Sequence, residues 1–240
     1  QGRINPAYFY GVFDPNDMRR DVSITMTGSN GKGVEKLIPF VPNSKAEGGG
    51  LTLNKWDENR QANPWVAAQR KSGINGMRMS EVYLGYAEVC AALGDVVTGK
   101  QYLKTVRERS FPQGLANTDA FIASFGNDLV RAIIEERGFE YAGEGDRRWT
   151  LIRSGYLPED IKRIKDMTKA MMDGLATKGY YEFENGNIIS AYIWTKLVDA
   201  KTIYGHRLTA QCPTDKVNDP VLYPGWRGQK DNWEEMGLNY

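Results

Sequence analysis

The most constraining feature of the 240-residue chain is a change of hydrophobic pattern at Met77. Beyond this point, apolar side chains recur at helical spacings, at Met79, Val82, Tyr83, Tyr86, Cys90 and Leu93. Such spacing is typical of an amphipathic α-helix, because it gathers the apolar side chains on one face. Gly94 and Asp95 then form a stop signal. The sequence therefore predicts a helix from Met77 to the residues before Gly94.

A second helix is predicted over roughly 98–109, with Tyr102 on its apolar face. Small and large residues follow one another along the two helices in an order that allows close approach: Ala87, Gly94, Gly99, Leu103 and Val106. This order resembles a helical hairpin of the tetratricopeptide type. One such hairpin cannot bury its apolar faces alone, so neighbouring helices are required.

A long helical stretch is predicted downstream, over about 119–154. Asn127 can cap the part of it over 128–141, because a short amide side chain accepts hydrogen bonds from the first turn of a helix. In its last part, 146–154, Trp149 and Ile152 lie on one side. We expect Trp149 to lie in the core for this reason.

Two further elements are predicted towards the end of the chain. Pro158 suits the first turn of a helix over about 159–177, because its fixed backbone angle fits that position. Residues 187–199 are rich in β-branched and aromatic side chains and predict a strand, with Trp194 in the core. The tail from 208 has the composition of a loop.

Residues 1–76 are irregular in pattern and rich in turn-forming residues. Only 22–26 and 37–41 have short β-like runs. Loops of such length in a compact domain are often functional, so we assign this segment to the ligand face. The predicted fold class is mainly α, with 1–76 as the loop-rich segment, 77–183 as a helical scaffold, and 184–240 as a tail of strand and loop.

Composition excludes several classes of protein. The net charge of +1 gives no general attraction to nucleic acid. With only two cysteines, the chain cannot have a fold built on disulfides. Cys90 lies in an apolar helical pattern, and we expect it to be a small buried apolar residue. One histidine excludes a histidine-rich metal site, and no apolar run is long enough to cross a membrane. We therefore expect no metal and no cofactor.

Two segments carry a family resemblance, 77–109 and 132–153. They are similar to the two conserved helical stretches of the SusD/RagB family, and Asp14-Pro15 with Arg19-Arg20 fits the region before them. The matching positions are Arg78, Glu81, Tyr86, Ala87, Glu88, Arg107, Arg109, Glu136, Arg137, Glu140, Glu144, Gly145, Arg147 and Arg153. Thr150 departs from the pattern, since the family usually has Asp there. Family members are considerably longer, so the chain resembles their C-terminal part.

The resemblance implies a function. Members of this family are surface lipoproteins of Bacteroidota that bind nutrients, mostly glycans, for a SusC-like TonB-dependent transporter. It therefore implies a non-enzymatic glycan-binding protein of the outer membrane, with a glycan ligand, a transporter partner and no nucleic acid. The lipid anchor, the only membrane contact, would lie upstream of this chain.

The charged residues of the family pattern alternate in sign at helical spacings. Such spacing favours ion pairs between neighbouring helices. The sequence therefore predicts a structural network, not a binding site, from Arg78, Glu81, Glu88, Glu136, Arg137, Glu140 and Arg147.

A glycan site requires flat aromatic faces, because the apolar faces of sugar rings stack on tryptophan and tyrosine. Polar side chains nearby then bond the sugar hydroxyls. The loop-rich segment supplies both kinds of residue. We predict stacking by Trp56, Trp65, Tyr8 and Tyr10, and hydrogen bonding by Asn54, Asp57 and Arg60.

Three alternatives remain open. Some relatives serve peptide uptake, so the cargo of this chain could be peptide. A tetratricopeptide-like scaffold with a groove for a partner segment is another possibility. An enzyme is the weakest alternative. The acid pairs Asp57/Glu58 and Glu144/Asp146 are no evidence for a glycosidase, because such pairs are common among 30 acidic residues. A Ser-His-Asp triad would have to use His206, and the chain contains no Gly-x-Ser-x-Gly elbow.

Overall fold

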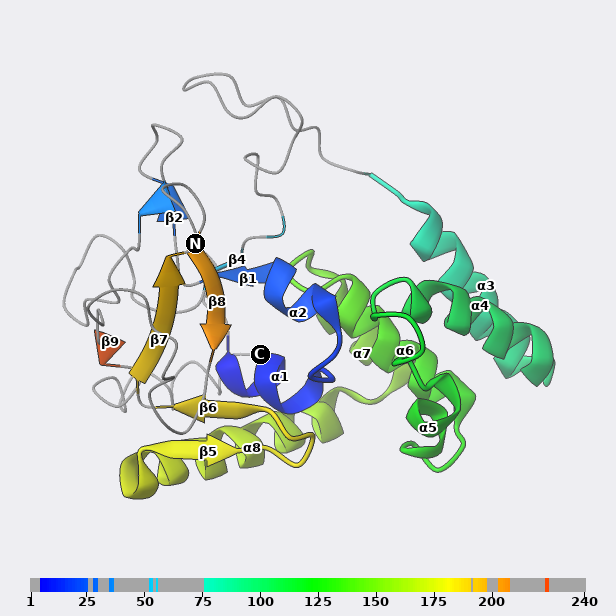
Figure 1. Ribbon diagram of the computed structural model, residues 1–240. Helices are drawn as coiled ribbons and strands as arrows, with labels where there is room; N and C mark the ends of the chain where they lie inside the picture. The colour runs from blue at the N-terminus through cyan, green and yellow to red at the C-terminus, as the bar shows by residue number, and fades with distance from the viewer. Residues whose placement is uncertain are drawn as a thin grey trace. The chain divides into compact units, whose positions relative to one another are not determined.

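The computed structural model describes residues 5–25, 28–29, 35–36, 52–53, 55, 76–190, 192–197, 203–207 and 223–224 (Figure 1). The chain divides into two compact units. The helical unit comprises residues 16–20 and 73–158, and the mixed unit comprises 1–15, 21–72 and 159–240. Over the described residues, eight helices dominate and the strands are short, so the fold is mainly α as predicted.

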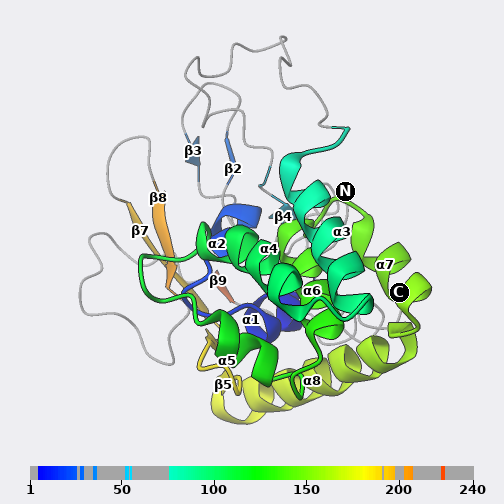
Figure 2. The same cartoon turned by 90° about the vertical axis from the view of Figure 1, so that its right-hand side faces the viewer.

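The helical unit is built on a hairpin of two helices. They are α3 (Met79–Ala92) and α4 (Val96–Glu108), which lie side by side (Figure 2). Gly94 takes a positive φ of 88° between them, and the side chain of Asp95 caps α4 by accepting a hydrogen bond from the backbone of Thr98. The predicted hairpin and its stop signal are therefore confirmed.

Gly99 determines how closely the two helices of this hairpin approach. A Cβ atom at this position would lie 3.0 Å from the carbonyl oxygen of Ala87 and 3.1 Å from Cδ2 of Leu129. The small residues thus allow close packing, as the sequence predicted. Larger residues fill the core around them: Leu84, Leu103, Val106, Ile122, Leu129, Ile133 and Tyr141.

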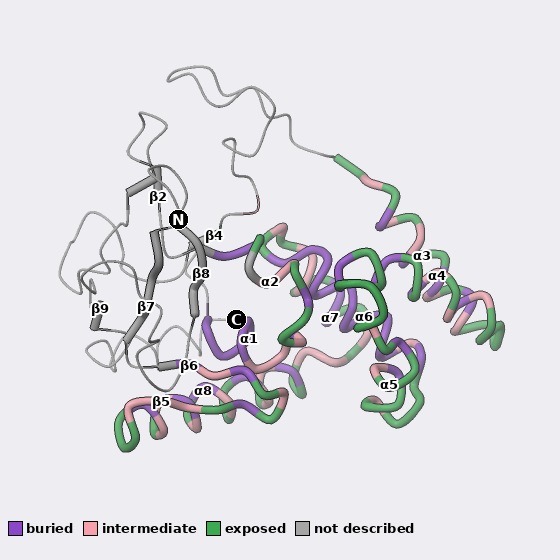
Figure 3. The backbone as a smooth tube through the Cα atoms, viewed as in Figure 1, coloured by how far each residue is buried: buried purple, intermediate pink, exposed green. Residues whose placement is uncertain are grey.

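The buried face of α3 differs from the predicted one. The apolar series beginning at Met79 was expected to face the core. Instead α3 buries Ser80, Leu84, Ala87 and Cys90, while most of the predicted face is exposed (Figure 3). Only Cys90 of that series is buried, as a free thiol. The physical reason is that α4 and α6 pack on the side that carries the small residue Ala87.

The helical stretch predicted over about 119–154 contains three helices, and the pieces expected at 128–141 and 146–154 are confirmed as the last two. The three helices are α5 (Thr118–Ala123), α6 (Leu129–Glu140) and α7 (Asp146–Ser154). Positive φ angles at Gly126 and Asn127 separate the first two. Asp128, not Asn127, caps α6, because its carboxylate accepts a hydrogen bond from the backbone of Arg131.

The predicted burial of Trp149 is wrong. Its side chain on α7 is 70% exposed, and Ile152 is exposed beside it. The inward residues of this helix are Thr150 and Leu151. A spacing of three marks one side of a helix, but it does not tell which side faces the core.

The mixed unit begins with two helices that the sequence analysis missed, α1 (Pro6–Val12) and α2 (Met18–Ser23), the latter shared with the helical unit. Asn5 caps α1 by accepting a hydrogen bond from Ala7. At the other end of α1, side chains distant in sequence donate hydrogen bonds to its carbonyl groups. The amide of Asn187 donates to the carbonyl oxygens of Tyr10 and Phe13, each at 2.8 Å. So short a helix depends on these contacts more than on its own pattern.

The long helix α8 (Leu157–Lys178) confirms the prediction for 159–177. It is followed by the hairpin of β5 (Tyr180–Glu182) and β6 (Ile188–Ser190), which is antiparallel with Tyr181 opposite Ile189. Gly174 of α8 lies against this hairpin, since a Cβ there would be 2.6 Å from the ring of Tyr181.

Short antiparallel strands complete the mixed unit. β7 (Tyr192–Leu197) lies between β8 (Ile203–Arg207) and β9 (Tyr223–Pro224). The predicted strand 187–199 is thus two strands, β6 and β7. Two small pairs occur earlier: β1 (Ile24–Thr25) with β4 (Thr52–Leu53), and β2 (Gly28–Ser29) with β3 (Glu35–Lys36). The predicted run 37–41 lies outside the described residues.

Candidate functional site

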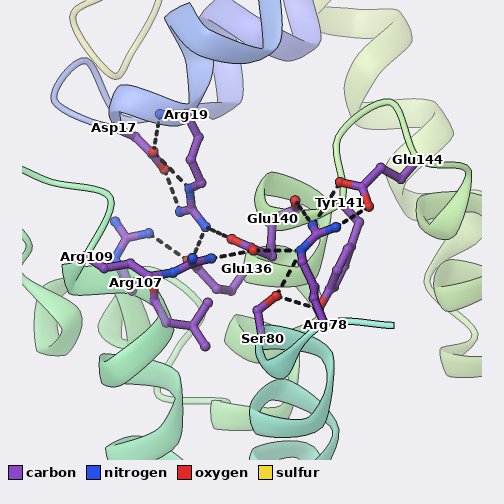
Figure 4. A network of polar contacts seen from close by, with 11 residues as sticks. Asp17, Arg19, Arg78, Ser80, Arg107, Arg109, Glu136, Glu140, Tyr141 and Glu144 are labelled. Carbon is purple, nitrogen blue, oxygen red and sulfur yellow. Dashed lines mark hydrogen bonds and ion pairs between the residues drawn. The ribbon is translucent and has the colours of Figure 1, made fainter. Parts of the chain in front are cut away.

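A buried cluster of charged side chains occupies the helical unit, centred on α6 (Figure 4). Glu136 is fully buried and pairs with two arginines. The distances from its carboxylate oxygens are 2.7 Å to Nη1 of Arg19 and 3.0 Å to Nη1 of Arg107. Asp17 holds Arg19 in turn, at 2.7 Å. One carboxylate on α6 therefore connects the segment 16–20 to α4.

Glu140 extends the cluster one turn along α6. Its carboxylate lies 3.1 Å from Nη1 of Arg19 and 3.3 Å from Nε of Arg78, and it also pairs with Arg109. Arg78 reaches Glu144 as well, with Nη2 donating to Oε1 at 2.8 Å. Arg78 precedes α3, and its guanidinium stacks over the ring of Tyr141 at 4.6 Å. The cluster thus joins α3, α4, α6 and the segment 16–20.

A second group of ion pairs attaches α7. Arg137 donates to Asp146 at 2.7 Å, Arg147 to Glu135 at 2.9 Å, and Arg153 to Glu88 of α3 at 2.7 Å. These contacts confirm the predicted structural network. Among the described residues, Glu81 is the member of the predicted set with no ion pair.

Sequence reasoning missed Asp17 and Arg19 as members of the cluster. The available signal was Arg19 itself, which fits the family pattern before the helices. Its pairing with Glu136 joins residues 117 positions apart, and no periodicity connects such positions. Only the fold brings them together.

Glu140 stays ionised in the cluster despite its burial. Burial alone would raise the pKa of Glu140, but the hydrogen bond and charge of Arg109 and the charge of Arg19 outweigh it, so the pKa is lowered. Burial would likewise lower the pKa of Arg19, but Glu136 and Asp17 raise it above its ordinary value. Both groups therefore stay charged near neutral pH.

These shifts predict how stability depends on pH. Because the pKa of Glu140 is lower in the folded protein, its contribution is complete above the unfolded value of 4.5 and is lost as the pH falls through the folded value. The difference in urea midpoint between wild type and Glu140→Gln should be constant near neutral pH and shrink below about pH 4.5.

Glu108→Gln is the matched control for this titration, since Glu108 lies exposed on α4 and pairs with Lys104 of the same helix. Its effect on the midpoint should be small at every pH. A Glu140→Gln difference that persisted undiminished at pH 3 would contradict the assignment.

The arrangement of charges is that of a scaffold. The carboxylates of Glu144 and Asp146, considered above as a catalytic pair, are each held by a different arginine, Arg78 and Arg137. Thr150, which departs from the family pattern, donates a hydrogen bond to Asp146 at 2.9 Å. No group of three possible metal ligands occurs within the described ranges. In the same ranges, no helix is long and apolar enough to span a membrane.

The predicted stacking residues divide into two groups. Tyr8 and Tyr10 lie on α1 and are buried, with 8% and 2% of their surface exposed. The ring of Tyr8 meets those of Phe9 and Phe13 edge to face, so it packs among neighbouring aromatics. The remaining predicted contacts lie outside the described residues: Trp56, Trp65, Asn54, Asp57 and Arg60. Glycan contact by any of the seven stays a prediction.

Comparison with known proteins gives the family. The family model described as "SusD family" matches residues 4–224, and the chain belongs to this family. A curated relative, SusD-like protein P25 from Formosa agariphila, is 28% identical over 158 residues. That match covers 65% of this chain and 26% of the relative, so the chain spans about a quarter of the relative's length. No solved structure matches the chain significantly.

Proposed function

We propose that this chain is part of a non-enzymatic cell-surface subunit that binds oligosaccharide or polysaccharide. The subunit delivers the glycan to a SusC-like TonB-dependent transporter in the outer membrane, and a lipid anchor outside these residues attaches it to the surface. The observation that carries the proposal is membership of the SusD family over residues 4–224. The ion-paired carboxylates of α6 agree with a scaffold that performs no catalysis.

The glycan contacts are assigned to the segment 53–65. Trp56 and Trp65 stand outside any amphipathic pattern and have polar neighbours suited to sugar hydroxyls: Asn54, Asp57 and Arg60. They are the first residues to test, because the rings of Tyr8 and Tyr10 are buried on α1. Flat aromatic rings fit the apolar faces of sugars and orient them.

Replacing Trp56 or Trp65 by alanine should weaken glycan binding at least about tenfold, because a stacking platform is lost. Native affinity electrophoresis of the whole protein, through gels that contain different polysaccharides, measures this effect. Trp56→Phe keeps a ring and should restore part of the retardation. Leu115→Ala, at an exposed loop position among the described residues, should leave it unchanged.

Three results would change the proposal. Retardation unchanged in both tryptophan variants would reject the segment 53–65 and keep the function. Retardation by a peptide digest and by no glycan would replace glycan by peptide as the cargo. Reducing sugar released from a glycan panel would contradict the non-enzymatic function.

A further inference from the structure

Two asparagine side chains from the β5–β6 hairpin hold the C-terminal end of α1. The amide nitrogen of Asn185 donates to the carbonyl oxygens of Tyr10 at 2.9 Å and Phe13 at 2.8 Å. The amide nitrogen of Asn187 donates to the same oxygens, each at 2.8 Å. We call this set of hydrogen bonds the asparagine clamp. All of its residues belong to the mixed unit.

The C-terminal end of α1 depends on the asparagine clamp for its hydrogen bonds. The last carbonyl groups of any helix lack partners within the helix. Helices commonly satisfy them with a glycine in the left-handed conformation or with a basic side chain in the last turn. Within residues 6–13, all of which the structure describes, Phe13 ends α1 with an extended backbone and the last turn contains no basic residue. The clamp therefore supplies donors for this end.

Asn185 is followed by Gly186, and an asparagine before glycine is prone to deamidation. In this reaction, the backbone nitrogen of the glycine attacks Cγ of the asparagine. The new N–Cγ bond replaces the Cγ–Nδ2 bond, and the side-chain amide leaves as ammonia with the proton of the backbone nitrogen. Solvent water then opens the cyclic imide to aspartate or isoaspartate. Glycine favours the attack because no Cβ shields its nitrogen.

In the folded hairpin, both reacting groups are held by hydrogen bonds. The backbone nitrogen of Gly186 donates to the carbonyl oxygen of Phe183 at 2.9 Å. Oδ1 of Asn185 accepts from the backbone nitrogen of Asn187 at 3.0 Å, while Nδ2 is held in the clamp. Attack on Cγ requires these bonds to break, so the hairpin must first open away from α1. Because such local opening costs free energy, the folded state protects the amide.

We propose that Asn185 is a deamidation site that the folded clamp keeps unreactive, and that its modification loosens α1 from the β5–β6 hairpin. The turn is accessible to water, since Gly186 is exposed and Asn185 is half-buried. Each opening of the hairpin therefore gives the reaction a chance to occur. The modification accumulates with the age of the protein and needs no enzyme.

Deamidation removes a hydrogen-bond donor from the clamp. A carboxylate at position 185 still accepts from the backbone of Asn187, but it has no hydrogen to donate. Its oxygens face the carbonyl oxygens of Tyr10 and Phe13 without a proton between them, which is unfavourable in a partly buried site. Asn187 alone then holds this end of α1.

Peptide mass spectrometry of the full-length protein, incubated in mildly alkaline buffer, measures the reaction. Asn185 should deamidate at least about tenfold more slowly in the native protein than in urea, because the native amide has to wait for local opening. The unfolded sample is the matched comparator, since it contains the same peptide. Equal rates in the two samples would contradict the protection, and an unmodified Asn185 in urea would contradict the site.

Asn185→Asp reproduces one product of the reaction and tests the clamp directly. It should lower the Tm of the full-length protein by about 4 °C or more, because donors are lost and a carboxylate faces two carbonyl oxygens. The backbone amides of α1 should exchange their hydrogens faster in this variant, since the end of the helix is less well held.

Asn117→Asp is the matched control, with the same chemical change at an exposed asparagine. Asn117 caps α5 by accepting a hydrogen bond from the backbone of Ala120 at 2.9 Å, and a carboxylate can accept it equally well. The Tm should therefore change by less than about 2 °C. Equal Tm shifts for the two variants, or unchanged hydrogen exchange in α1, would overturn the proposed effect of the modification.

Discussion

Replacing Glu136 by glutamine should lower the free energy of unfolding by about 3–5 kcal/mol, the cost typical of removing one partner from a buried ion pair. The carboxylate is fully buried and lies 2.7 Å from Arg19 and 3.0 Å from Arg107. Glutamine keeps the shape of the side chain but removes its charge. Arg107, itself buried, then loses the charge of the carboxylate that faces it.

Urea unfolding followed by circular dichroism measures this effect. Asp166→Asn is the control, because it removes an acid from the pair with Lys162 on the exposed face of α8. Exposed pairs of this kind contribute little, so the midpoint should not shift measurably. A Glu136→Gln effect no larger than that of Asp166→Asn would show that the cluster does not stabilise the helical unit.

Substitutions at Gly99 should destabilise the protein in order of side-chain size, although alanine is the better helix former. A Cβ atom would lie 3.0 Å from the backbone oxygen of Ala87, which cannot move without shifting α3. Overpacking of this kind costs typically about 1–3 kcal/mol. We expect a loss of about 1–2 kcal/mol for Gly99→Ala and about 3 kcal/mol for Gly99→Val.

Gln101→Ala is the control, since Gln101 is exposed two residues further along α4. It should leave the thermal unfolding temperature nearly unchanged. An increase in stability for Gly99→Ala would mean that helix propensity outweighs close packing at this position, and that α3 and α4 are not in tight contact there.

The sequence predicted the hairpin of α3 and α4 because its determinants are local. Helical spacing, the stop at Gly94 and the small residue Gly99 act within thirty residues of one another. Alternating charges at helical spacings predicted that these helices would form ion pairs. Their actual partners were not predicted, because Arg19 and Arg78 reach α6 from distant parts of the chain.

The errors have a common physical origin. α1 was missed because it is short and its carbonyl groups are bonded by Asn185 and Asn187, which lie far along the chain. The face of α3 was assigned wrongly because both of its sides are apolar, and periodicity alone cannot choose between them. Trp149 was placed in the core because its spacing from Ile152 marks one side of α7 but does not tell which side is buried.

For the candidate glycan site, the chemistry of sugar stacking predicted the type of residue and the segment. It selected Trp56 and Trp65, which lie in the segment 53–65. Their geometry lies outside the described residues, so this assignment stays a prediction. Tyr8 and Tyr10 are buried on α1, and their contact with glycan likewise stays a prediction. Aromatic side chains stack on sugars and fill cores equally well, and composition does not separate the two uses.

By itself, the sequence determined the family, the mainly helical class and the hairpin at 77–109, because these depend on local periodicity and on a pattern of residues along the chain. Only the tertiary structure decided which face of α3 is buried, which arginines neutralise Glu136 and Glu140, and that Trp149 is exposed. The reason is physical: burial and charge pairing are properties of the neighbours that a residue acquires on folding, and those neighbours lie far away in the sequence.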